Sequence, residues 1–467
     1  MTHDPELAAF LKANPEYPTT DSLDLLRLNE YTRLDVNSQV YLDYTGAGLY
    51  AESQILNHHR LLSEHVFGNP HSSNPSSLAS TELVEHARAS ILNFFHADPG
   101  EYVPIFTANA SGALKIVGES YPFNSDSRYL LTFDNHNSVN GIREFAHAHG
   151  ANVTYIPIAL PDMRVDESQI ELELERPSKN GFNLFAFPAQ SNFSGVQHPL
   201  HWIEKAHAHG WDVLLDAAAF VPTNPLDLSS VHPDFVPVSF YKMFGYPTGI
   251  GALIARRTAL RKLHRPWFAG GTITVASVQG DKFYLAEGPA AFEDGTLDYL
   301  NIPAVEIGLK HIESIGHQTI HKRVAALTGW LLSNLSAMKH STGQTLVHIY
   351  GPTTMEGRGD AVTVNFFDRN GKAIDHRFIE SEANKSNISL RTGCFCNPGA
   401  GEVALGISRV ELDMCFHQPG HEQRLSVDDF RVCIDGKSSG AVRMSVGMVS
   451  NFSDIQTMLE FARGLLN

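Results

Sequence analysis

Short apolar segments alternate with helix-like stretches over much of this chain, and this alternation constrains the fold more than any other sequence feature. The apolar segments are VPIFTA, RYLLTF, ANVTYIPI, FNLFAFP, WDVLLDAAA, FVPVSF and IGALIA. Helix-like stretches such as STELVEHARASILNFF and PLHWIEKAHAHG lie between several of them. Strands that alternate with helices indicate a mostly parallel sheet that is covered on both faces. We therefore predict an α/β architecture over about residues 40 to 300.

The remainder of the chain predicts a second, smaller domain. A helical region runs from NIPAVEIGLKHIESIG through VAALTGWLLSNLSAM, and strand-like TLVHIYG, AVTVNFF and AVRMSVG follow before a closing helix, DIQTMLEFARGLLN. The 467 residues also exceed what a single hydrophobic core usually holds. We predict a large domain at residues 40–305, a small α+β domain at 306–467, and an N-terminal segment, 1–39, that packs with the small domain.

Charge and cysteine content argue against several classes of protein. A net charge of −16 is unfavourable for a nucleic-acid or anionic-membrane surface. Four cysteines are too few for a disulfide framework in a chain of this length. The start, MTHDPELAAFLKANPEYP, does not resemble a secretory signal, and no apolar run approaches the roughly 20 residues that span a bilayer. We therefore expect a reducing compartment, the cytosol.

Lys242 lies among uncharged residues in SFYKMFGYPTGIGALIA, directly after the predicted strand VPVSF. Desolvation makes a charged amine costly there, which favours a neutral, reactive amine, although a lysine with its tip in water is the alternative. Asp216 ends the predicted strand WDVLLD, where an aspartate alone would usually cap a helix or turn. Together the two residues suit pyridoxal phosphate: the amine binds the aldehyde, and the carboxylate keeps the pyridine nitrogen protonated.

A phosphate site is also indicated. FTANASGALKIVGES is a strand, a turn of small residues and a helix, which presents free N–H groups at the positive end of a helix dipole. Ala110 and Ser111 are small enough for close approach, and Ser239 stands three residues before Lys242 as a further donor. Small-residue turns that merely begin a helix are the competing interpretation.

Polar residues follow two other predicted strands. His136 comes just after RYLLTF, where it could lie flat against an aromatic cofactor or be an ordinary loop histidine. FPAQSNFSG offers Gln190 and Asn192, whose amides could donate to a phenolate oxygen or belong to a turn. Arg443 in GAVRMSVG could bind a substrate carboxylate with two hydrogen bonds, or form a structural ion pair.

The Gly/Pro-rich loop SLRTGCFCNPGAGE holds Arg391, Cys394 and Cys396. The Cys-x-Cys pair could be half of a zinc site, with Cys415, His417 and His421 as further ligands, although the spacing is irregular. The two cysteines could also be buried and inert. A nearby arginine would instead stabilise a thiolate, which is the reactive form of cysteine.

Eight longer motifs carry a resemblance to a known family. They are YLDYTGAGLY, NPHSSNPSS, FTANASGALK, FPAQSNFSGVQHPLHWIE, LLDAAAFVPTNPLDLS, DFVPVSFYKMFGYPTGIGALI, FEDGTLDYL and LRTGCFCNPGA. In this order the chain resembles class V pyridoxal-phosphate-dependent enzymes, and most of all the N-terminal, cysteine-desulfurase-like domain of molybdenum cofactor sulfurases. The resemblance implies fold-type I, with a mostly parallel seven-stranded sheet in the large domain and a smaller α+β domain.

The resemblance also implies roles for individual residues. Lys242 would bind the cofactor as a Schiff base, Asp216 would pair with the pyridine nitrogen, His136 would stack on the ring and Asn192 would face the ring oxygen. Ala110, Ser111, Ser239 and Tyr241 would hold the phosphate, and Thr272 in GGT would complete the phosphate site of the partner subunit in a homodimer. Arg443, with Arg391 nearby, would bind the substrate carboxylate, and Cys396 would accept the sulfur.

The implied function is a cysteine desulfurase or sulfurtransferase. It would take sulfur from L-cysteine as a persulfide on Cys396, release alanine and pass the sulfur to an acceptor, which could be a protein. Full-length relatives carry a further C-terminal domain that binds the molybdenum cofactor, and this chain stops where their first domain ends, so sulfuration of that cofactor by this chain alone is not expected. Relatives also often have a third cysteine where this chain has Gly401.

Two other functions remain open on the sequence. One is an enzyme of the same fold with other chemistry, such as a C–S lyase, an aminotransferase or a tailoring enzyme of specialised metabolism, because fold and cofactor do not fix the reaction. The other is a non-catalytic zinc-binding or scaffold protein built around the cysteine loop, against which the combination of Lys242 and Asp216 argues.

Overall fold

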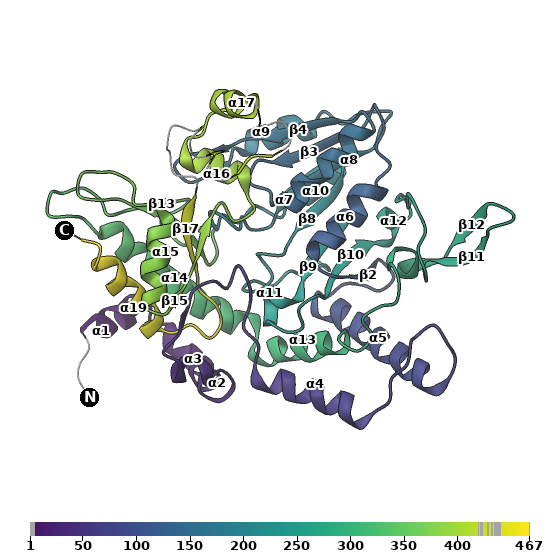
Figure 1. The fold of residues 1–467 in the computed structure, drawn as a ribbon, viewed down its shortest axis with the longest axis horizontal. Coiled ribbons are helices and arrows are strands. Elements are labelled where there is room, and N and C mark those ends of the chain that lie inside the picture. Colours follow the sequence, from purple (N-terminus) through teal and green to yellow (C-terminus); the bar gives the residue numbers. More distant parts are fainter. Residues whose placement is uncertain are drawn as a thin grey trace.

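A seven-stranded sheet forms the centre of the molecule in the computed structural model, which describes residues 5–418, 420, 424–426, 429–430, 433 and 440–466 (Figure 1). Its strands are β2 (Tyr102–Thr107), β3 (Arg128–Thr132), β4 (Asn152–Ile156), β7 (Asn183–Pro188), β8 (Asp212–Asp216), β9 (Phe235–Ser239) and β10 (Gly251–Arg256). They lie in the order β2-β10-β9-β8-β7-β3-β4; β10 is antiparallel to both neighbours, and the other neighbouring pairs are parallel. The seven apolar segments are these seven strands, so the predicted mostly parallel sheet is confirmed.

Both faces of this sheet are buried, which explains why its strands read as continuous apolar runs. Phe185 and Phe187 of β7 belong to one core cluster and Leu184 and Ala186 to another, because successive side chains of a strand point to opposite faces. Helices α6 (Ala110–Ser120), α7 (Asn137–Asn140) and α8 (Ile142–Ala148) contribute side chains to the second cluster. Helices α5 (Pro75–Phe94), α9 (Glu167–Leu174), α10 (Trp202–Ala208) and α13 (Pro303–Ile315) contribute to the first.

A second, antiparallel sheet organises the C-terminal part of the chain. It consists of β13 (Val347–Tyr350), β14 (Ala361–Phe366), β17 (Ala441–Ser445) and β16 (Arg391–Gly393), in that spatial order. Helices α14 (His317–Ala337) and α15 (His376–Lys385) contact its strands, and α19 (Phe452–Arg463) packs on α14. The expected smaller α+β unit is therefore present, whereas the domain limits at residues 39 and 305 stay a prediction.

The N-terminal helices α1 (Pro5–Ala13), α2 (Ser22–Glu30) and α3 (Arg33–Val36) pack on this C-terminal part (Figure 1). The ring of Phe10 lies 4.9 Å from that of Phe452 and 5.5 Å from that of Trp330. The buried Arg27 pairs with Asp454 of α19. The first and last helices of the chain thus share one core.

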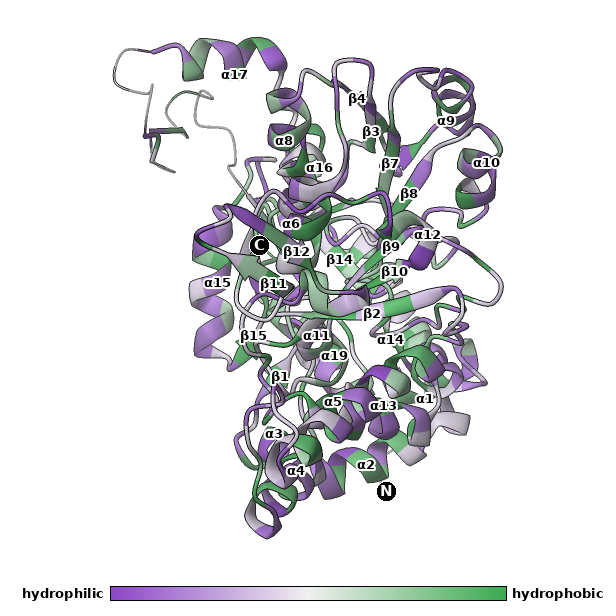
Figure 2. Cartoon of the chain, turned by 90° about the vertical axis from the view of Figure 1, so that its right-hand side faces the viewer, coloured by the Kyte–Doolittle hydropathy of each residue, from purple (hydrophilic) through white to green (hydrophobic). Residues whose placement is uncertain are grey.

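Several elements were not foreseen from the sequence. The most prominent is the antiparallel hairpin of β11 (Ile273–Ser277) and β12 (Lys282–Leu285), which projects from the body in Figure 1 and points toward the viewer in Figure 2. The others are α4 (Glu52–Glu64), α11 (Phe240–Phe244), α12 (Arg257–Leu260), α16 (Pro398–Leu405), α17 (Arg409–Phe416), the 3-10 helices η1 (Tyr17–Thr20) and η2 (Gly288–Phe292), and the short strands β1 (Val40–Tyr41), β5 (Ile158–Ala159), β6 (Arg164–Val165) and β15 (Ile388–Ser389).

Cys415 of α17 forms a disulfide with Cys433. Four cysteines are too few for a disulfide framework, yet this one disulfide forms, and it involves Cys415, which the sequence offered as a possible zinc ligand. The pairing corrects that interpretation, because a cystine sulfur is not the thiolate that zinc requires. Within the described part of the chain, every helix is too short or too polar to span a lipid bilayer.

Candidate active site

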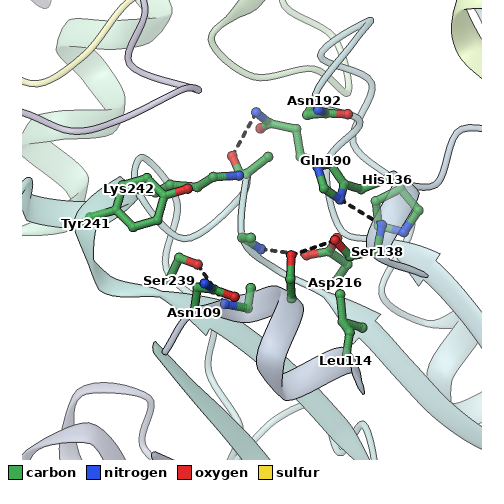
Figure 3. Close-up of a pocket in the computed structure, with 15 residues that line it drawn as sticks. Asn109, Leu114, His136, Ser138, Gln190, Asn192, Asp216, Ser239, Tyr241 and Lys242 are labelled. Carbon is green, nitrogen blue, oxygen red and sulfur yellow. Dashed lines mark hydrogen bonds between the residues drawn. The ribbon is translucent and has the colours of Figure 1, made fainter. Parts of the chain in front are cut away.

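A cavity of about 200 Å³ opens at the carboxyl-terminal edge of the central sheet (Figure 3). Eight of the residues predicted to form the site line it: Ala110, Ser111, His136, Asn192, Asp216, Ser239, Tyr241 and Lys242. They come from five separate segments, each of which follows or ends a strand. Parallel strands end at the same edge of a sheet, so their polar ends converge where ligands of open α/β sheets bind.

Lys242 stands on the short helix α11, directly after β9. Gly48 donates its N–H to the carbonyl oxygen of Tyr241 at 3.0 Å, and a Cβ on Gly48 would lie only 2.9 Å from the carbonyl oxygen of Lys242. The helix ends at Gly245, whose φ of +76° suits glycine. Two glycines, one from YTGAGLY and one from KMFGYP, therefore fix the backbone that carries the amine.

Burial lowers the pKa of the Lys242 amine below its ordinary 10.5. The Asp216 carboxylate opposes this shift, and the guanidinium groups of Arg443 and Arg391 add to it. A lysine with a lowered pKa is more often neutral, and the neutral amine is the nucleophile. The buried environment therefore explains why a single lysine lies in this apolar stretch: it keeps the amine reactive.

Asp216 and His136 lie on neighbouring walls of the cavity (Figure 3). The buried Asp216 accepts a hydrogen bond at Oδ1 from the N–H of Ala218, at 3.0 Å. The Nδ1 of His136 accepts from the N–H of Ser138 at 3.1 Å, which leaves the ring proton on Nε2. Burial lowers the pKa of His136, although the Asp216 carboxylate acts in the opposite direction. His136 is therefore a neutral ring beside a carboxylate.

Hydroxyl groups gather where α6 begins. Asn109 caps this helix by accepting from the N–H of Gly112 at 2.9 Å, and the N–H of Ala110 donates to Oγ of Ser239 at 2.9 Å. The hydroxyls of Ser111 and Ser138 are 2.6 Å apart. Hydroxyl groups that can turn toward an anion at the positive end of a helix dipole suit a phosphate.

Asn109, Ser138 and Gln190 also line the cavity, although none was selected as a site residue. Asn109 had a usable signal, because an asparagine before a small-residue run is an N-cap pattern. Ser138 follows His136 by two residues at the start of α7 and had only that proximity. Gln190 was considered beside Asn192; its Nε2 donates to the carboxylate of Asp360 at 2.8 Å.

Arg391 and Arg443 face each other across β16 and β17, and both bind Asp43. The Nη2 of Arg443 lies 3.1 Å from Oδ1 of Asp43, and the Nη2 of Arg391 lies 2.6 Å from Oδ2. Arg443 is buried and its Nε has no partner among the described residues, whereas Arg391 is half-exposed. Asp43 belongs to the motif YLDYTGAGLY, but its role was not predicted.

The cysteine loop, residues 393–397, connects β16 to α16 and rests against the cavity wall. Asn137 donates its N–H to the carbonyl oxygen of Cys396 at 2.7 Å, and Nδ2 of Asn192 donates to that of Phe395 at 2.8 Å. Cys394 and Cys396 are free, and both residues are exposed. The protein around the sulfur of Cys394 nevertheless removes part of its hydration, which raises the pKa of this thiol. The loop thus brings two thiols to the site, and it engages the amide predicted to face a cofactor oxygen.

Two further groups of predicted residues lie elsewhere. Thr272 is buried and its hydroxyl donates to the carbonyl oxygen of Ala269 at 2.8 Å, outside this chain's own cavity. A role in the site of a partner subunit stays a prediction. His417 donates from Nδ1 to the carbonyl oxygen of Asp413 at 2.7 Å, and His421 lies outside the described residues. Across the described residues, His, Cys, Asp and Glu side chains form no cluster of three or more that could hold a metal.

Comparisons with known proteins agree on the family and the fold. The family model "Aminotransferase class-V" matches residues 40–458. A molybdenum cofactor sulfurase from Solanum lycopersicum is 38% identical over 497 residues, which cover 99% of this chain but 60% of that relative. The apo structure of a cysteine desulfurase from Thermococcus onnurineus NA1 has a TM-score of 0.76 and 22% identity, covering 95% of this chain and 98% of its own. The cystine C–S lyase C-DES, solved with its product cysteine persulfide, has a TM-score of 0.68 and 18% identity, covering 92% and 98%.

Proposed function

This chain belongs to the class-V aminotransferase family, and from that premise we propose that it is a pyridoxal-phosphate-dependent sulfurtransferase of the cysteine desulfurase type. It takes sulfur from L-cysteine, holds it as a persulfide on Cys396 and releases alanine. The fold-type I architecture expected from the sequence is the one it shares with cysteine desulfurases. One observation carries the proposal: a lysine with a lowered pKa and a buried aspartate line one cavity, and a loop with two free thiols is hydrogen-bonded to Asn192 in the wall of that cavity.

The residues of the cavity fit pyridoxal phosphate. Lys242 offers the amine that an aldehyde requires, and Asp216 offers a buried carboxylate for a pyridine nitrogen. The start of α6, with the hydroxyls of Ser111 and Ser239, offers donors for the phosphate. When bound, this cofactor supplies an electron-withdrawing ring that stabilises negative charge at the α-carbon of an amino acid.

The side chains around the cavity transfer the proton, bind the substrate carboxylate and contact the cofactor. The Lys242 amine takes the proton from the α-carbon of the substrate and later returns a proton to the product. Arg443 and Arg391 bind the substrate carboxylate, with Asp43 holding both guanidinium groups in place. The neutral ring of His136 would cover one face of the cofactor, and the Asn192 amide would donate to its ring oxygen.

Cys396 performs the sulfur transfer. Its thiolate forms a bond to the sulfur of L-cysteine while the bond between that sulfur and the β-carbon breaks. The electron pair of the broken bond stays on carbon, which takes up a proton and leaves as the methyl group of alanine. L-cysteine and the Cys396 thiol thus become alanine and a Cys396 persulfide, with no external oxidant or reductant.

A two-part experiment tests this function. Borohydride treatment of the cofactor-loaded protein, followed by peptide mapping, should place a reduced pyridoxyl group on Lys242. Incubation with L-cysteine should then yield alanine together with a persulfide, and the persulfide should disappear in Cys396→Ala while the visible cofactor band remains. A protein that binds the cofactor but forms neither product from L-cysteine would be a class V enzyme with other chemistry, such as a C–S lyase or an aminotransferase.

The proposal includes a homodimer. The β11–β12 hairpin and the segment before it expose apolar side chains to solvent, among them Trp267, Phe268, Val275, Val278 and Tyr284. Val278 is fully exposed, and a protruding apolar strand pair is a surface that another chain commonly covers. Because Thr272 stands at the base of this hairpin, a second copy seated here would bring it toward the neighbouring phosphate site. Light scattering should give twice the chain mass, and Val278→Glu should weaken that association.

Sulfur delivery to an acceptor protein also belongs to the proposal, because both loop thiols are exposed. We propose the cytosol as its location, where Cys394 and Cys396 would stay free; the Cys415–Cys433 disulfide argues against this location, because such bonds are rare in a reducing compartment. The proposal covers sulfur mobilisation alone, since the chain spans 60% of its sulfurase relative.

A further inference from the structure

Asn397 directly follows Cys396, and its side chain is completely buried. Its Nδ2 donates to the carbonyl oxygen of Asp134 at 2.7 Å and to Oδ1 of Asn192 at 2.9 Å. Its Oδ1 accepts from the N–H of Ala400 at 3.2 Å and so caps α16. Both hydrogens and the oxygen of this amide are therefore engaged.

The two donated hydrogen bonds connect the cysteine loop to the cavity. Asp134 lies two residues before His136 in the loop that follows β3, and Asn192 lies in the loop that follows β7. Both His136 and Asn192 line the cavity. A single side chain next to the thiol thus fixes the loop against two walls of the site.

The backbone of the cysteine loop needs such support. Phe395 and Cys396 have φ of +55° and +56°, a left-handed conformation that residues other than glycine seldom adopt. Strained backbone of this kind persists where the surroundings hold it. The loop joins no strand of the sheet at these residues. The buried ring of Phe395, which lies 5.4 Å from that of Phe193, holds it on one side, and the hydrogen bonds from Asn137, Asn192 and Asn397 hold its backbone.

We propose that Asn397 is a positioning residue that keeps the Cys396 thiol at the cavity during sulfur transfer. This inference rests on the proposed function and deepens it. Asn397 touches neither the reacting atoms nor Lys242, and it acts through the loop backbone. Its loss should therefore affect transfer to Cys396 while attachment of the cofactor at Lys242 remains.

The test is Asn397→Asp in the full chain loaded with pyridoxal phosphate. Aspartate keeps the size of the side chain and the oxygen that caps α16, but it lacks both donated hydrogen bonds. In a single turnover with L-cysteine and no reductant, mass spectrometry should show Cys396 persulfide forming at least about tenfold more slowly, because small misplacements of a reacting group are costly. The visible cofactor band and its response to L-cysteine should be retained.

A second measurement does not depend on activity. Without cofactor, alkylation of Cys396 by iodoacetamide should become severalfold faster in Asn397→Asp, because in a released loop the exposed thiol moves away from the cavity wall and meets the reagent from more directions. Asn397→Ser, which also keeps a capping oxygen, should behave alike. Asn387→Asp is the matched control: Nδ2 of Asn387 donates to the carbonyl oxygens of Asn37 and Ser38, at 2.8 and 3.1 Å, and its φ is +54°. It lies away from the cavity and should change both rates by less than twofold.

Unchanged transfer and alkylation rates in both Asn397 variants would overturn the inference. Loss of the cofactor band in both variants would overturn it as well, because Asn397 would then support the fold as a whole. Failure of the proposed function gives a different pattern: the wild-type protein would form no persulfide from L-cysteine, whereas the alkylation difference between Asn397→Asp and Asn387→Asp would persist.

Discussion

The floor of the cavity, formed by Lys242 and Asp216, and the cysteine loop belong to one candidate site, yet they are built in different ways. The floor residues stand at the ends of the adjacent strands β9 and β8, inside a sheet that is buried on both faces. The cysteine loop has left-handed backbone at Gly393, Phe395 and Cys396. Side-chain amides, one backbone N–H and the single buried ring of Phe395 hold it in place, and its thiols are exposed.

The difference matches two physical tasks. A shifted pKa requires that an amine and its charged neighbours stay at fixed distances in a dry environment, which a close-packed sheet provides. A sulfur carrier must reach the cavity and then an acceptor, which requires a segment that opens at low cost. The loop buries one apolar side chain, Phe395, and is otherwise held by hydrogen bonds, so it should open more easily than the packed sheet. The site therefore joins a rigid part that activates the substrate to a detachable part that removes the sulfur.

The largest expected effect comes from substituting one residue of the floor and one residue of the cysteine loop, because the two substitutions should abolish different steps. Lys242→Ala should remove the borohydride-stable cofactor adduct and reduce alanine formation by about 1,000-fold or more, since it deletes both the covalent anchor and the proton-transferring amine. Cys396→Ala should keep the adduct and lose only the persulfide. If Cys396→Ala also abolished cofactor attachment, the floor and the loop would not be separable.

A smaller effect is expected when the packing of the floor and of the loop side is compared by adding one methyl group to each. A Cβ on Gly48 would lie 2.9 Å from the carbonyl oxygen of Lys242 and 3.2 Å from the nitrogen of Gly245. Because these are backbone atoms, Gly48→Ala should lower the free energy of unfolding by about 1–3 kcal/mol and weaken cofactor binding. The contrasting variant is Gly401→Ala in α16, where the nearest atom is the side-chain Cβ of Cys394 at 3.3 Å.

Alanine favours a helix over glycine, so Gly401→Ala should change the free energy of unfolding by no more than about 1 kcal/mol. Urea denaturation of both variants measures the difference. Equal destabilisation by the two substitutions would mean that the loop side of the site is packed as tightly as the floor.

The sequence predicted the floor better than the loop, for physical reasons. Buried parallel strands must be apolar throughout, so each strand and the polar residue at its end could be located before any contact was known. The hairpin of β11 and β12 was missed because it is exposed and has no buried face to impose a pattern. The sequence marked Cys396 but gave no sign that Asn397 holds it, because that role depends on Asp134 and Asn192 from distant segments. Asp43 was overlooked for the same reason.

The smallest expected effect concerns the pKa of the Lys242 amine, which the neighbouring charges should shift in the directions that the structure indicates. In the protein without cofactor, the rate at which pyridoxal phosphate reacts with Lys242 follows the neutral fraction of the amine. It should therefore rise with pH and level off below 10.5, because burial lowers the pKa of Lys242 from that value. N-acetyl-lysine methylamide provides the unburied reference.

Two variants should move this plateau in opposite directions. Asp216 raises the pKa of Lys242, so Asp216→Asn should shift the plateau to lower pH. Arg391 lowers the pKa, so Arg391→Gln should shift the plateau to higher pH, and by less, because Arg391 is half-exposed and solvent screens its charge. Arg391 is the first residue of β16, which leads into the cysteine loop. The shift in Arg391→Gln therefore measures how strongly a charge beside that loop changes the pKa of Lys242. Shifts of the same sign in both variants would show that loosened packing, and not charge, sets the pKa of the amine.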